Sequence, residues 1–376
     1  MTVEKTLAEL VKIDSVSSRS NAEMTEYLTN RCEALGLQVK HFPYTDENGI
    51  EKINLIAVAG TEFSGGTNVE LALVGHTDTV PYDPEWKQAL NLTEDEGKLY
   101  GRGACDTKAF IAAALTAVEN LDQKNLRRPI ALIFTADEEV GLMGAKKLAD
   151  LSPLRAHYSI VGEPTSLRPI RAGKGYCLAE ILVRGREGHS AYPAFGASAI
   201  LRAGRLLSQI EKIGLELRAD QHEAFDPAFT TLNIGLIHGG TAKNIIAGQC
   251  HFTLEWRPVP NQKPTRVLEL LDRAIAEEIK ADPDFECKVD LVRSDGGFET
   301  SVDSRLVTLM EEISGRSAAT VSFGTEAPQM IRLGAESVVF GPGDIRVAHR
   351  TGEFVPISEL NACVEMLSKA VKNLCQ

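Results

Sequence analysis

The sequence has little of what marks several common classes of protein. Aromatic residues are 6% of the 376 residues, and the seven cysteines are scattered, odd in number and without a C-x-x-C pair. This cysteine usage is typical of free thiols, so we expect a cytoplasmic protein. Apolar runs such as 110–118 and 130–136 are far shorter than the roughly 20 residues that span a bilayer. We therefore expect no membrane partner and no signal peptide.

Positive charge is also scarce. The chain has 40 Lys and Arg against 52 Asp and Glu, a formal net charge of -12, and no block of basic residues. Proteins that bind nucleic acids hold the phosphate backbone with clustered Lys and Arg. This composition therefore predicts that nucleic acid is not a partner.

Several catalytic and nucleotide-binding motifs are missing. The sequence contains no H-E-x-x-H, no G-x-S-x-G and no Walker loop, and the stretch 171–176 (RAGKGY) lacks the Ser or Thr of a P-loop. The segment 101–106 (GRGACD) approaches the dinucleotide fingerprint, but Asp106 stands in place of its third glycine. That glycine is needed for close packing, so we do not expect NAD binding.

Apolar runs and helical periods alternate along much of the chain. Runs typical of buried strands are followed by amphipathic stretches, which predicts an α/β fold with a doubly wound, mostly parallel sheet. The expected strands, all predicted to be buried and parallel, are 54–58, 69–74, 130–135, 158–161 and 337–340. The expected helices are 4–13, 21–35, 108–120, 144–151 and 305–313.

The middle of the chain has a different pattern. It predicts strands at 176–184, 231–237, 250–257 and 286–293, interleaved with amphipathic helices at 198–213 and 265–279. This order is typical of a small α+β domain with an open-faced sheet. We predict that this domain, residues 173–294, is inserted between the two parts of a catalytic domain, residues 1–172 and 295–376.

Five residues of the kind that binds metal ions lie near the ends of these expected elements. His76, Glu139, Glu163 and His349 each follow an expected strand, and Asp106 lies in a glycine-rich loop before a helix. Ligands of doubly wound sheets gather beyond the carboxyl ends of the strands. Two histidines and three carboxylates suit two zinc ions that share one carboxylate, which predicts a hydrolase that activates water. Co2+ and Mn2+ accept similar ligands.

Two further carboxylates adjoin these residues. Asp78 is two residues after His76, on the same face of an extended segment, where it could orient a metal-bound imidazole. Glu138 directly precedes Glu139, and two adjacent buried carboxylates need a cation or a proton nearby. One of this pair could bind metal while the other takes a proton from water.

Each of these residues, taken singly, has a simpler interpretation. Asp106 could cap the helix that follows it, Glu163 could be an ordinary loop residue before a proline, and the acidic triplet 137–139 could be a solvated turn. A metal-dependent binding protein without turnover and a purely structural dimer module also remain open. The joint pattern of five ligand-type residues in suitable loops favours a metal centre.

These motifs, in this order, resemble the M20 family of zinc metallopeptidases and deacylases over essentially the whole chain. Within the family the likeness is greatest to the bacterial deacetylases of N2-acetyl-L-ornithine, and succinyl-diaminopimelate desuccinylases are less similar in the last two segments. The segments concerned are 75–81 (GHTDTVP), 135–139 (TADEE), 162–167 (GEPTSL), 188–190 (GHS), 238–240 (HGG), 325–328 (TEAP) and 341–343 (GPG) followed by 348–349 (AH).

The resemblance implies a role for each candidate ligand. It assigns one zinc ion to His76 and Glu163, the other to Glu139 and His349, and the bridging position to Asp106. It also implies the inserted domain, which acts in the family as a lid and commonly as a dimerisation domain. A homodimer is therefore expected from the resemblance.

The resemblance also implies roles for residues that bind no metal. Asp78 would orient His76, and Glu138 would be the general acid and base. His189, in the G-H-S segment, matches a histidine that helps to stabilise the tetrahedral oxyanion, often across a dimer interface. By itself His189 could equally be a loop residue near a helix start.

Four residues match positions that face the substrate in relatives: Asn244, Arg257, Gly324 and Thr325. The fork of an arginine suits a carboxylate, although Arg257 could instead form a structural ion pair. Glu326 could meet a cationic side chain of the substrate, but the sequence does not place it.

The implied activity is hydrolysis of the amide of a small N-acyl amino acid, with N2-acetyl-L-ornithine and arginine biosynthesis as the leading interpretation. A broad N-acyl-amino-acid deacylase, a succinyl-diaminopimelate desuccinylase and a dipeptidase remain open. The chain departs from the family pattern at Arg350 and Thr351, which replace Gln-Pro, and at Ala247, which replaces a proline. The first departure could alter side-chain selectivity.

Overall fold

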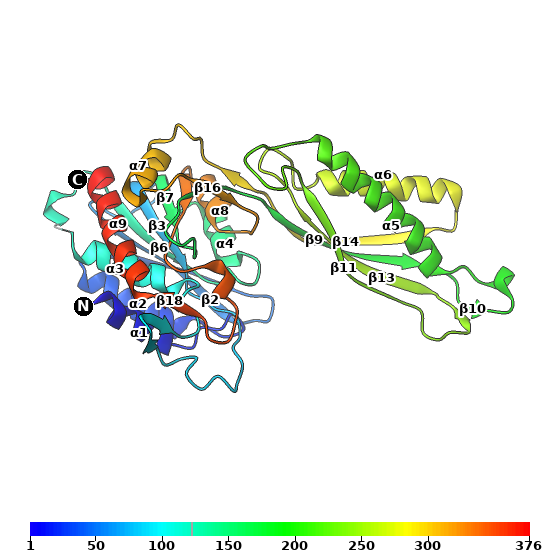
Figure 1. The fold of residues 1–376 in the computed structure, drawn as a ribbon, viewed down its shortest axis with the longest axis horizontal. Helices are drawn as coiled ribbons and strands as arrows, with labels where there is room; N and C mark the ends of the chain where they lie inside the picture. The colour runs from blue at the N-terminus through cyan, green and yellow to red at the C-terminus, as the bar shows by residue number, and fades with distance from the viewer. Residues whose placement is uncertain (122) are drawn as a thin grey trace. The chain divides into compact units, whose positions relative to one another are not determined.

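The computed structural model describes residues 1–121 and 123–376. The chain folds into two compact units (Figure 1). The first unit comprises Met1–Arg171, Glu299–Ala319 and Thr325–Gln376, and the second comprises Ala172–Phe298 and Thr320–Gly324. The second unit takes in the whole of the expected insertion, 173–294, together with a few flanking residues and the separate segment 320–324.

The first unit is built on a nine-stranded mixed sheet in the described part of the chain. Its order is β1-β2-β6-β3-β7-β17-β8-β15, with β16 beside β8, and the central strands β6, β3, β7 and β17 are parallel. The division between the units falls within β8, β15 and β16. The strands are β1 (Gln38–Thr45), β2 (Glu51–Ala59), β3 (Thr67–His76), β6 (Ile130–Thr135), β7 (Leu154–Val161), β8 (Ile170–Gly173), β15 (Phe298–Glu299), β16 (Ala319–Val321) and β17 (Glu336–Val339).

Both faces of the central strands are buried, as expected for a parallel sheet covered on two sides. Successive side chains of β3 point to opposite faces, so Leu71 and Leu73 join one hydrophobic core while Ala72 and Val74 are buried on the other side. This is why the sequence shows continuous apolar runs here rather than alternation.

Helices cover both faces of this sheet (Figure 1). The helices α1, α2, α3, α7 and α9 pack on the face that carries Leu71 and Leu73, and α4 and α8 pack on the other face. Their bounds are α1 (Val3–Lys12), α2 (Ala22–Ala34), α3 (Lys108–Glu119), α4 (Met143–Leu151), α7 (Arg305–Ser314), α8 (Ala327–Arg332) and α9 (Ile357–Cys375), and a small sheet adds β4 (Thr93–Asp95), β5 (Lys98–Tyr100) and β18 (Phe354–Pro356).

The second unit is a four-stranded antiparallel sheet with two helices on one face. The strand order is β11-β13-β9-β14, and alternate residues of β9 pack against the helices α5 and α6. The short strands β10 and β12 pair with each other, and in the sequence they lie between strands of this sheet. The elements are β9 (Tyr176–Arg184), β10 (Gly188–His189), α5 (Ala199–Glu216), β11 (Thr231–Gly239), β12 (Ile245–Ile246), β13 (Gln249–Arg257), α6 (Arg266–Ala281) and β14 (Glu286–Asp295).

The α/β class and the order of the expected elements are confirmed, but one strand direction was wrong. The run 54–58 lies in β2, which pairs antiparallel with both β1 and β6. A buried apolar run indicates burial on both faces but not direction, and here β2 returns along β1 after a short turn. Neither β1 nor α9 was predicted from the sequence. Within residues 1–121 and 123–376, none of the helices combines the length and the apolar composition that a membrane span requires.

Candidate metal centre and active site

The fold brings candidate ligands to one edge of the central sheet. His76 is the last residue of β3, and Glu139 and Glu163 come shortly after β6 and β7. These three strands are neighbours and parallel, so their carboxyl ends meet at the same edge. His349 follows β17, the next strand of the sheet, and Asp106 lies just before α3.

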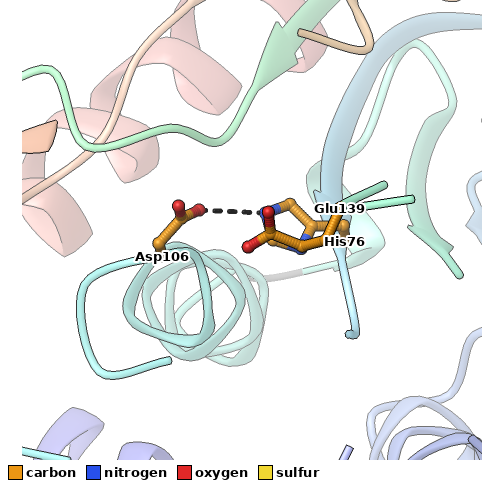
Figure 2. A group of neighbouring side chains, drawn as sticks. All are labelled: His76, Asp106 and Glu139. Atoms are coloured by element: carbon orange, nitrogen blue, oxygen red, sulfur yellow. Dashed lines mark hydrogen bonds and ion pairs between the residues drawn. The ribbon is translucent and has the colours of Figure 1, made fainter. Parts of the chain in front are cut away.

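Asp106 lies between two histidines. Nε2 of His76 is 3.0 Å from Oδ1 of Asp106, and Nε2 of His349 is 3.3 Å from Oδ2. Nε2 of His349 is also 3.0 Å from Oε1 of Glu139. Ligand atoms of His76, Asp106 and Glu139 all lie within 4.8 Å of one another, and Figure 2 shows these side chains converging. Each carboxylate oxygen of Asp106 therefore faces a different histidine, as a bridging ligand would.

The carboxylates of this centre crowd negative charge into a buried space. Burial raises the pKa of Glu163 well above its ordinary value, and the charges of Asp106 and Glu138 add to that rise. Burial likewise raises the pKa of Glu138 well above its ordinary value and raises that of Glu139. A divalent cation relieves such repulsion, so this set of carboxylate and imidazole donors fits zinc or a similar metal.

The surroundings of the two histidines favour their charged form, whereas those of the glutamates favour the neutral form. Hydrogen bonds with Asp106 and Glu139 raise the pKa of His349 to about 10. Burial opposes protonation of His76, but its hydrogen bonds with Asp106 and Asp78 prevail and raise its pKa well above the ordinary value. Both rings therefore sit where positive charge is favoured, which is also what a metal ion requires.

Asp78 holds the turn that carries Glu138 and Glu139. Its Oδ1 accepts the N–H of Glu138 at 3.1 Å, and its Oδ2 accepts the N–H of Glu139 at 3.2 Å and the hydroxyl of Ser17 at 2.7 Å. Nδ1 of His76 is 3.0 Å from the backbone oxygen of Asp78 and 3.7 Å from its Oδ1. The carboxylate of Asp78 thus accepts hydrogen bonds from the turn. The shorter of the two contacts between Asp78 and the His76 ring is made by the backbone oxygen of Asp78.

A buried ion pair that sequence reasoning missed holds the residue before this turn. Nζ of Lys52, which is 1% exposed, donates to Oδ1 of Asp137 at 2.8 Å and to the backbone oxygens of Ser17 and Arg19. The hydroxyl of Tyr44 donates to Oδ2 of Asp137 at 2.8 Å. Asp137 has a φ of 56°, which few non-glycine residues adopt. No local pattern links a strand lysine to this acidic triplet, so no sequence signal could have found the pair.

Gly162 allows Glu163 to lie close to helix α3. The N–H of Gly162 donates to the backbone oxygen of Val74 at 2.8 Å, and a Cβ at Gly162 would lie 2.2 Å from the ring of Phe110. Any larger residue would push the end of β7 away from α3. Glu163 itself is buried, with 5% of its surface exposed.

Thr325 and Glu326 lie at the start of α8, and both are buried. The hydroxyl of Thr135, at the end of β6, donates to Oε1 of Glu326. Oε2 of Glu326 has no hydrogen-bond partner among the described residues. That Glu326 contacts a cationic group of the substrate stays a prediction. Its carboxyl group is buried near the end of β6, which is an uncommon place for an acidic side chain.

Replacing Glu326 by glutamine should stabilise the metal-free protein more at pH 8 than at pH 5. Burial raises the pKa of Glu326 from 4.5 to about 7. The stabilising contribution of its protonated form is therefore full below pH 4.5 and is lost as the pH rises towards 7. A shift of this size corresponds to about 3 kcal/mol at most. Glutamine keeps the acceptor for Thr135 and does not ionise.

The measurement is urea unfolding of both proteins in the presence of a chelator at the two pH values. An increase in the free energy of unfolding that is the same at pH 5 and pH 8 would show that Glu326 has an ordinary pKa.

In the second unit, His189 and Asn244 lie in neighbouring segments. His189 belongs to β10, which pairs with β12, and its Nδ1 accepts the N–H of Ala191 at 3.1 Å. The N–H of Ser190 donates to the backbone oxygen of Asn244 at 3.1 Å. Because Nδ1 is an acceptor, a neutral His189 ring carries its proton on Nε2 and can donate it to an oxygen atom.

Arg257 is engaged in an ion pair within the second unit. Its Nε is 2.8 Å from Oε1 of Glu255, and its Nη1 donates to the backbone oxygen of Ser322 at 2.9 Å. Its guanidinium lies over the ring of Tyr176, 4.6 Å from the centroid. Gly324 is near the same tyrosine, since a Cβ at Gly324 would lie 3.9 Å from the Cβ of Tyr176. The structural ion pair that the sequence left open for Arg257 is therefore present, and a substrate carboxylate would have to share Arg257 with Glu255.

A group of histidine and carboxylate donors at the carboxyl edge of a doubly wound sheet, with Glu138 on the adjacent turn, is typical of metal-dependent hydrolases. A model of peptidase family M20/M25/M40 matches residues 72–373 of this chain. The chain belongs to this family, and it is an amidohydrolase.

Relatives of known name match almost the full length of the chain. An acetylornithine deacetylase of Myxococcus xanthus is 54% identical over 371 residues, which cover 98% of this chain and 97% of that protein. An acetylornithine deacetylase of Proteus mirabilis is 34% identical over 366 residues, covering 96% of this chain and 92% of that protein.

Solved structures share the fold over nearly the whole chain. A tripeptidase from Staphylococcus aureus is 25% identical with a TM-score of 0.80, and the match covers 99% of this chain and 97% of that one. A protein of Bacillus subtilis described as a dinuclear metal binding peptidase of the M20 family is 17% identical with a TM-score of 0.69, and the match covers 99% of this chain and 97% of that one.

Proposed function

We propose that the protein hydrolyses the N-acetyl amide of N2-acetyl-L-ornithine to L-ornithine and acetate, a step of arginine biosynthesis. The observation that carries the proposal is the position of Asp106 between His76 and His349, with Glu138 on the adjacent turn. The substrate is chosen because relatives that match over nearly their full length, the first of them 54% identical, have the name acetylornithine deacetylase.

We propose that two zinc ions occupy the centre, with Co2+ or Mn2+ as possible substitutes. His76 and Glu163 would hold one ion, Glu139 and His349 would hold the other, and Asp106 would bridge them. When bound, such ions polarise an acyl carbonyl and lower the pKa of water towards 7. The crowded carboxylates and the two facing histidines are the features of this chain that support the assignment.

In the proposed reaction, Glu138 carries the proton. Its carboxylate takes a proton from the attacking water as the oxygen bonds to the acetyl carbon. It returns that proton to the amide nitrogen when the C–N bond breaks, so that a neutral amine and acetic acid form, and the acetic acid then loses its proton to give acetate. Burial raises the pKa of Glu138, which makes its carboxylate a better base than an exposed one. Asp78 keeps the turn in place through the main chain of Glu138.

Residues of the second unit complete the proposal. The Nε2–H of His189 would donate to the oxyanion, where a fixed donor contributes most because charge develops there in the transition state. Arg257 would hold the substrate α-carboxylate, with Asn244 and the loop of Gly324 and Thr325 as further contacts. Because His189 belongs to the inserted domain, which the family resemblance makes a lid, closure of that lid would govern turnover.

We also propose a homodimer in the cytoplasm, as the family resemblance implies. Exposed apolar residues on β11 and α5 support a partner surface on the second unit, in particular Leu236, Ile237, Ile200 and Leu201. Light scattering coupled to size-exclusion chromatography measures the mass in solution, and a monomer at micromolar concentration would contradict the dimer.

The proposed substrate is tested with a panel of amides on the zinc-loaded protein. We expect kcat/KM for N2-acetyl-L-ornithine to exceed that for N-acetyl-L-methionine by at least about a hundredfold, because a buried polar site rejects a side chain that leaves it unpaired. Amine release would be measured for these two compounds, for N-succinyl-L,L-diaminopimelate and for a dipeptide. Equal rates for all acetylated amino acids would indicate a broad deacylase. Preference for the succinyl compound would indicate a desuccinylase, and preference for the dipeptide a dipeptidase.

A further inference from the structure

A buried carboxylate outside the proposed ligand set holds the loop that carries Asp106. Glu353 is 1% exposed. Its Oε1 accepts the N–H of Cys105 at 2.9 Å and that of Asp106 at 3.0 Å. Its Oε2 accepts Nη1 of Arg102 at 2.5 Å. Both oxygens of Glu353 are therefore committed to one short loop.

The backbone of this loop depends on Glu353 for its hydrogen bonds. The N–H groups of Ala104 and Lys108 donate to carbonyls within the loop, whereas those of Cys105 and Asp106 donate to Glu353. Buried N–H groups require a partner, so loss of the Glu353 carboxylate would leave the N–H groups of Cys105 and Asp106 unsatisfied. Asp106 is the residue that faces both histidines.

Arg102 fixes the carboxylate of Glu353 in turn. Arg102 is 2% exposed, its Nη2 donates to the backbone oxygen of Pro81 at 3.3 Å, and its guanidinium lies over the ring of Trp86, 5.5 Å from the centroid. The two charges neutralise each other in a buried place, where either alone would be costly. The carboxylate of Glu353 is thus fixed by Arg102 on one oxygen and by the backbone of the Asp106 loop on the other.

Glu353 also belongs to the segment that carries His349. Its N–H donates to the backbone oxygen of Arg350 at 3.2 Å, and its own backbone oxygen accepts the N–H of Gly101 at 3.0 Å. Side chain and main chain of one residue therefore join the Asp106 loop to the His349 segment. Across this junction, Nε2 of His349 is 3.3 Å from Oδ2 of Asp106.

We propose that Glu353, held by Arg102, is a positioning residue that sets the separation of Asp106 and His349 and thereby the affinity of the centre for the cation they share. The inference rests on the proposed metal centre. Groups that orient metal ligands typically change metal affinity by about 10- to 100-fold when they are removed. A purely structural ion pair would change the stability of the fold and leave metal affinity unaltered.

The test is titration of metal-free protein with cobalt(II) chloride, followed by calorimetry and visible absorption. For Glu353→Ala, we expect the cobalt ion that Asp106 and His349 share to bind about 10- to 100-fold less tightly, with a changed absorption spectrum. Glu353→Gln keeps an acceptor for the two N–H groups but loses the charge opposite Arg102, and we expect an intermediate loss. The matched control is Asp282→Asn, which weakens the bidentate pair of Arg202 and Asp282 in the second unit.

In the control, we expect a lower unfolding temperature with both cobalt affinities unchanged. Cobalt isotherms and spectra of the two Glu353 variants that superimpose on the wild type, together with a lower unfolding temperature, would overturn the inference. If Glu353→Ala does not fold, Glu353→Gln alone tests the inference, and an unchanged cobalt affinity in that variant would overturn it. Failure of the wild type to bind cobalt stoichiometrically would overturn the proposed metal centre itself, and the inference with it.

Discussion

Replacement of Glu138 by alanine is expected to lower kcat at least about a thousandfold while the protein keeps its metal ions. A positioned general acid or base contributes about 10²- to 10⁴-fold, and Glu138 is proposed to act in both proton transfers. The turn should survive the change, because Asp78 binds the main-chain N–H groups of residues 138 and 139 rather than the Glu138 side chain. The measurements are kcat for N2-acetyl-L-ornithine and metal content by elemental analysis.

The stability of the same variant provides a second criterion. Burial and neighbouring carboxylates raise the pKa of Glu138, so removal of its carboxyl group relieves repulsion in the metal-free protein. The unfolding temperature of metal-free Glu138→Ala should therefore equal or exceed that of the wild type at pH 8. Loss of metal together with activity would instead make Glu138 a ligand, and the assignment of Glu139 as the ligand of the pair would need to be reversed.

Removal of metal by a chelator is expected to abolish turnover and to destabilise the protein, and added Zn2+ should restore both. A ligand that binds only the folded state at a thousandfold excess over its Kd stabilises by about 4 kcal/mol. The increase in stability on metal binding should be larger at pH 8 than at pH 5. Burial raises the pKa of Glu163 and Glu139, so the contribution of these two groups to the stability of the metal-free protein is lost as they ionise with rising pH.

The measurement is the unfolding temperature with chelator and with Zn2+ at the two pH values. His349→Ala should lose most of the metal-dependent increase, because its ring faces both Asp106 and Glu139. His157→Ala is the matched control, since its side chain is 56% exposed on the strand β7 and stacks on Tyr158. The same response to metal in both variants would argue against His349 as a ligand.

Much of the candidate site was predictable because its residues follow recognisable strands. His76, Glu139 and Glu163 each come after an apolar run, and parallel runs end at one edge of a sheet. The direction of a run was not predictable from its composition, which is why the strand containing 54–58 was wrongly expected to be parallel. The roles of the individual ligands remain predictions, since geometry alone does not assign a metal ion to a residue.

The sequence by itself determined the α/β class, the order of most elements and the placement of ligand-type residues at strand ends, because periodicity and turn chemistry are local properties of the chain. Only the tertiary structure decided which oxygen of Asp106 faces which histidine, and that Lys52 pairs with Asp137 and Arg102 with Glu353. Arg102 and Glu353 are 251 residues apart in the sequence. Contacts of this kind arise from the packing of distant segments, and no local pattern of residues records them.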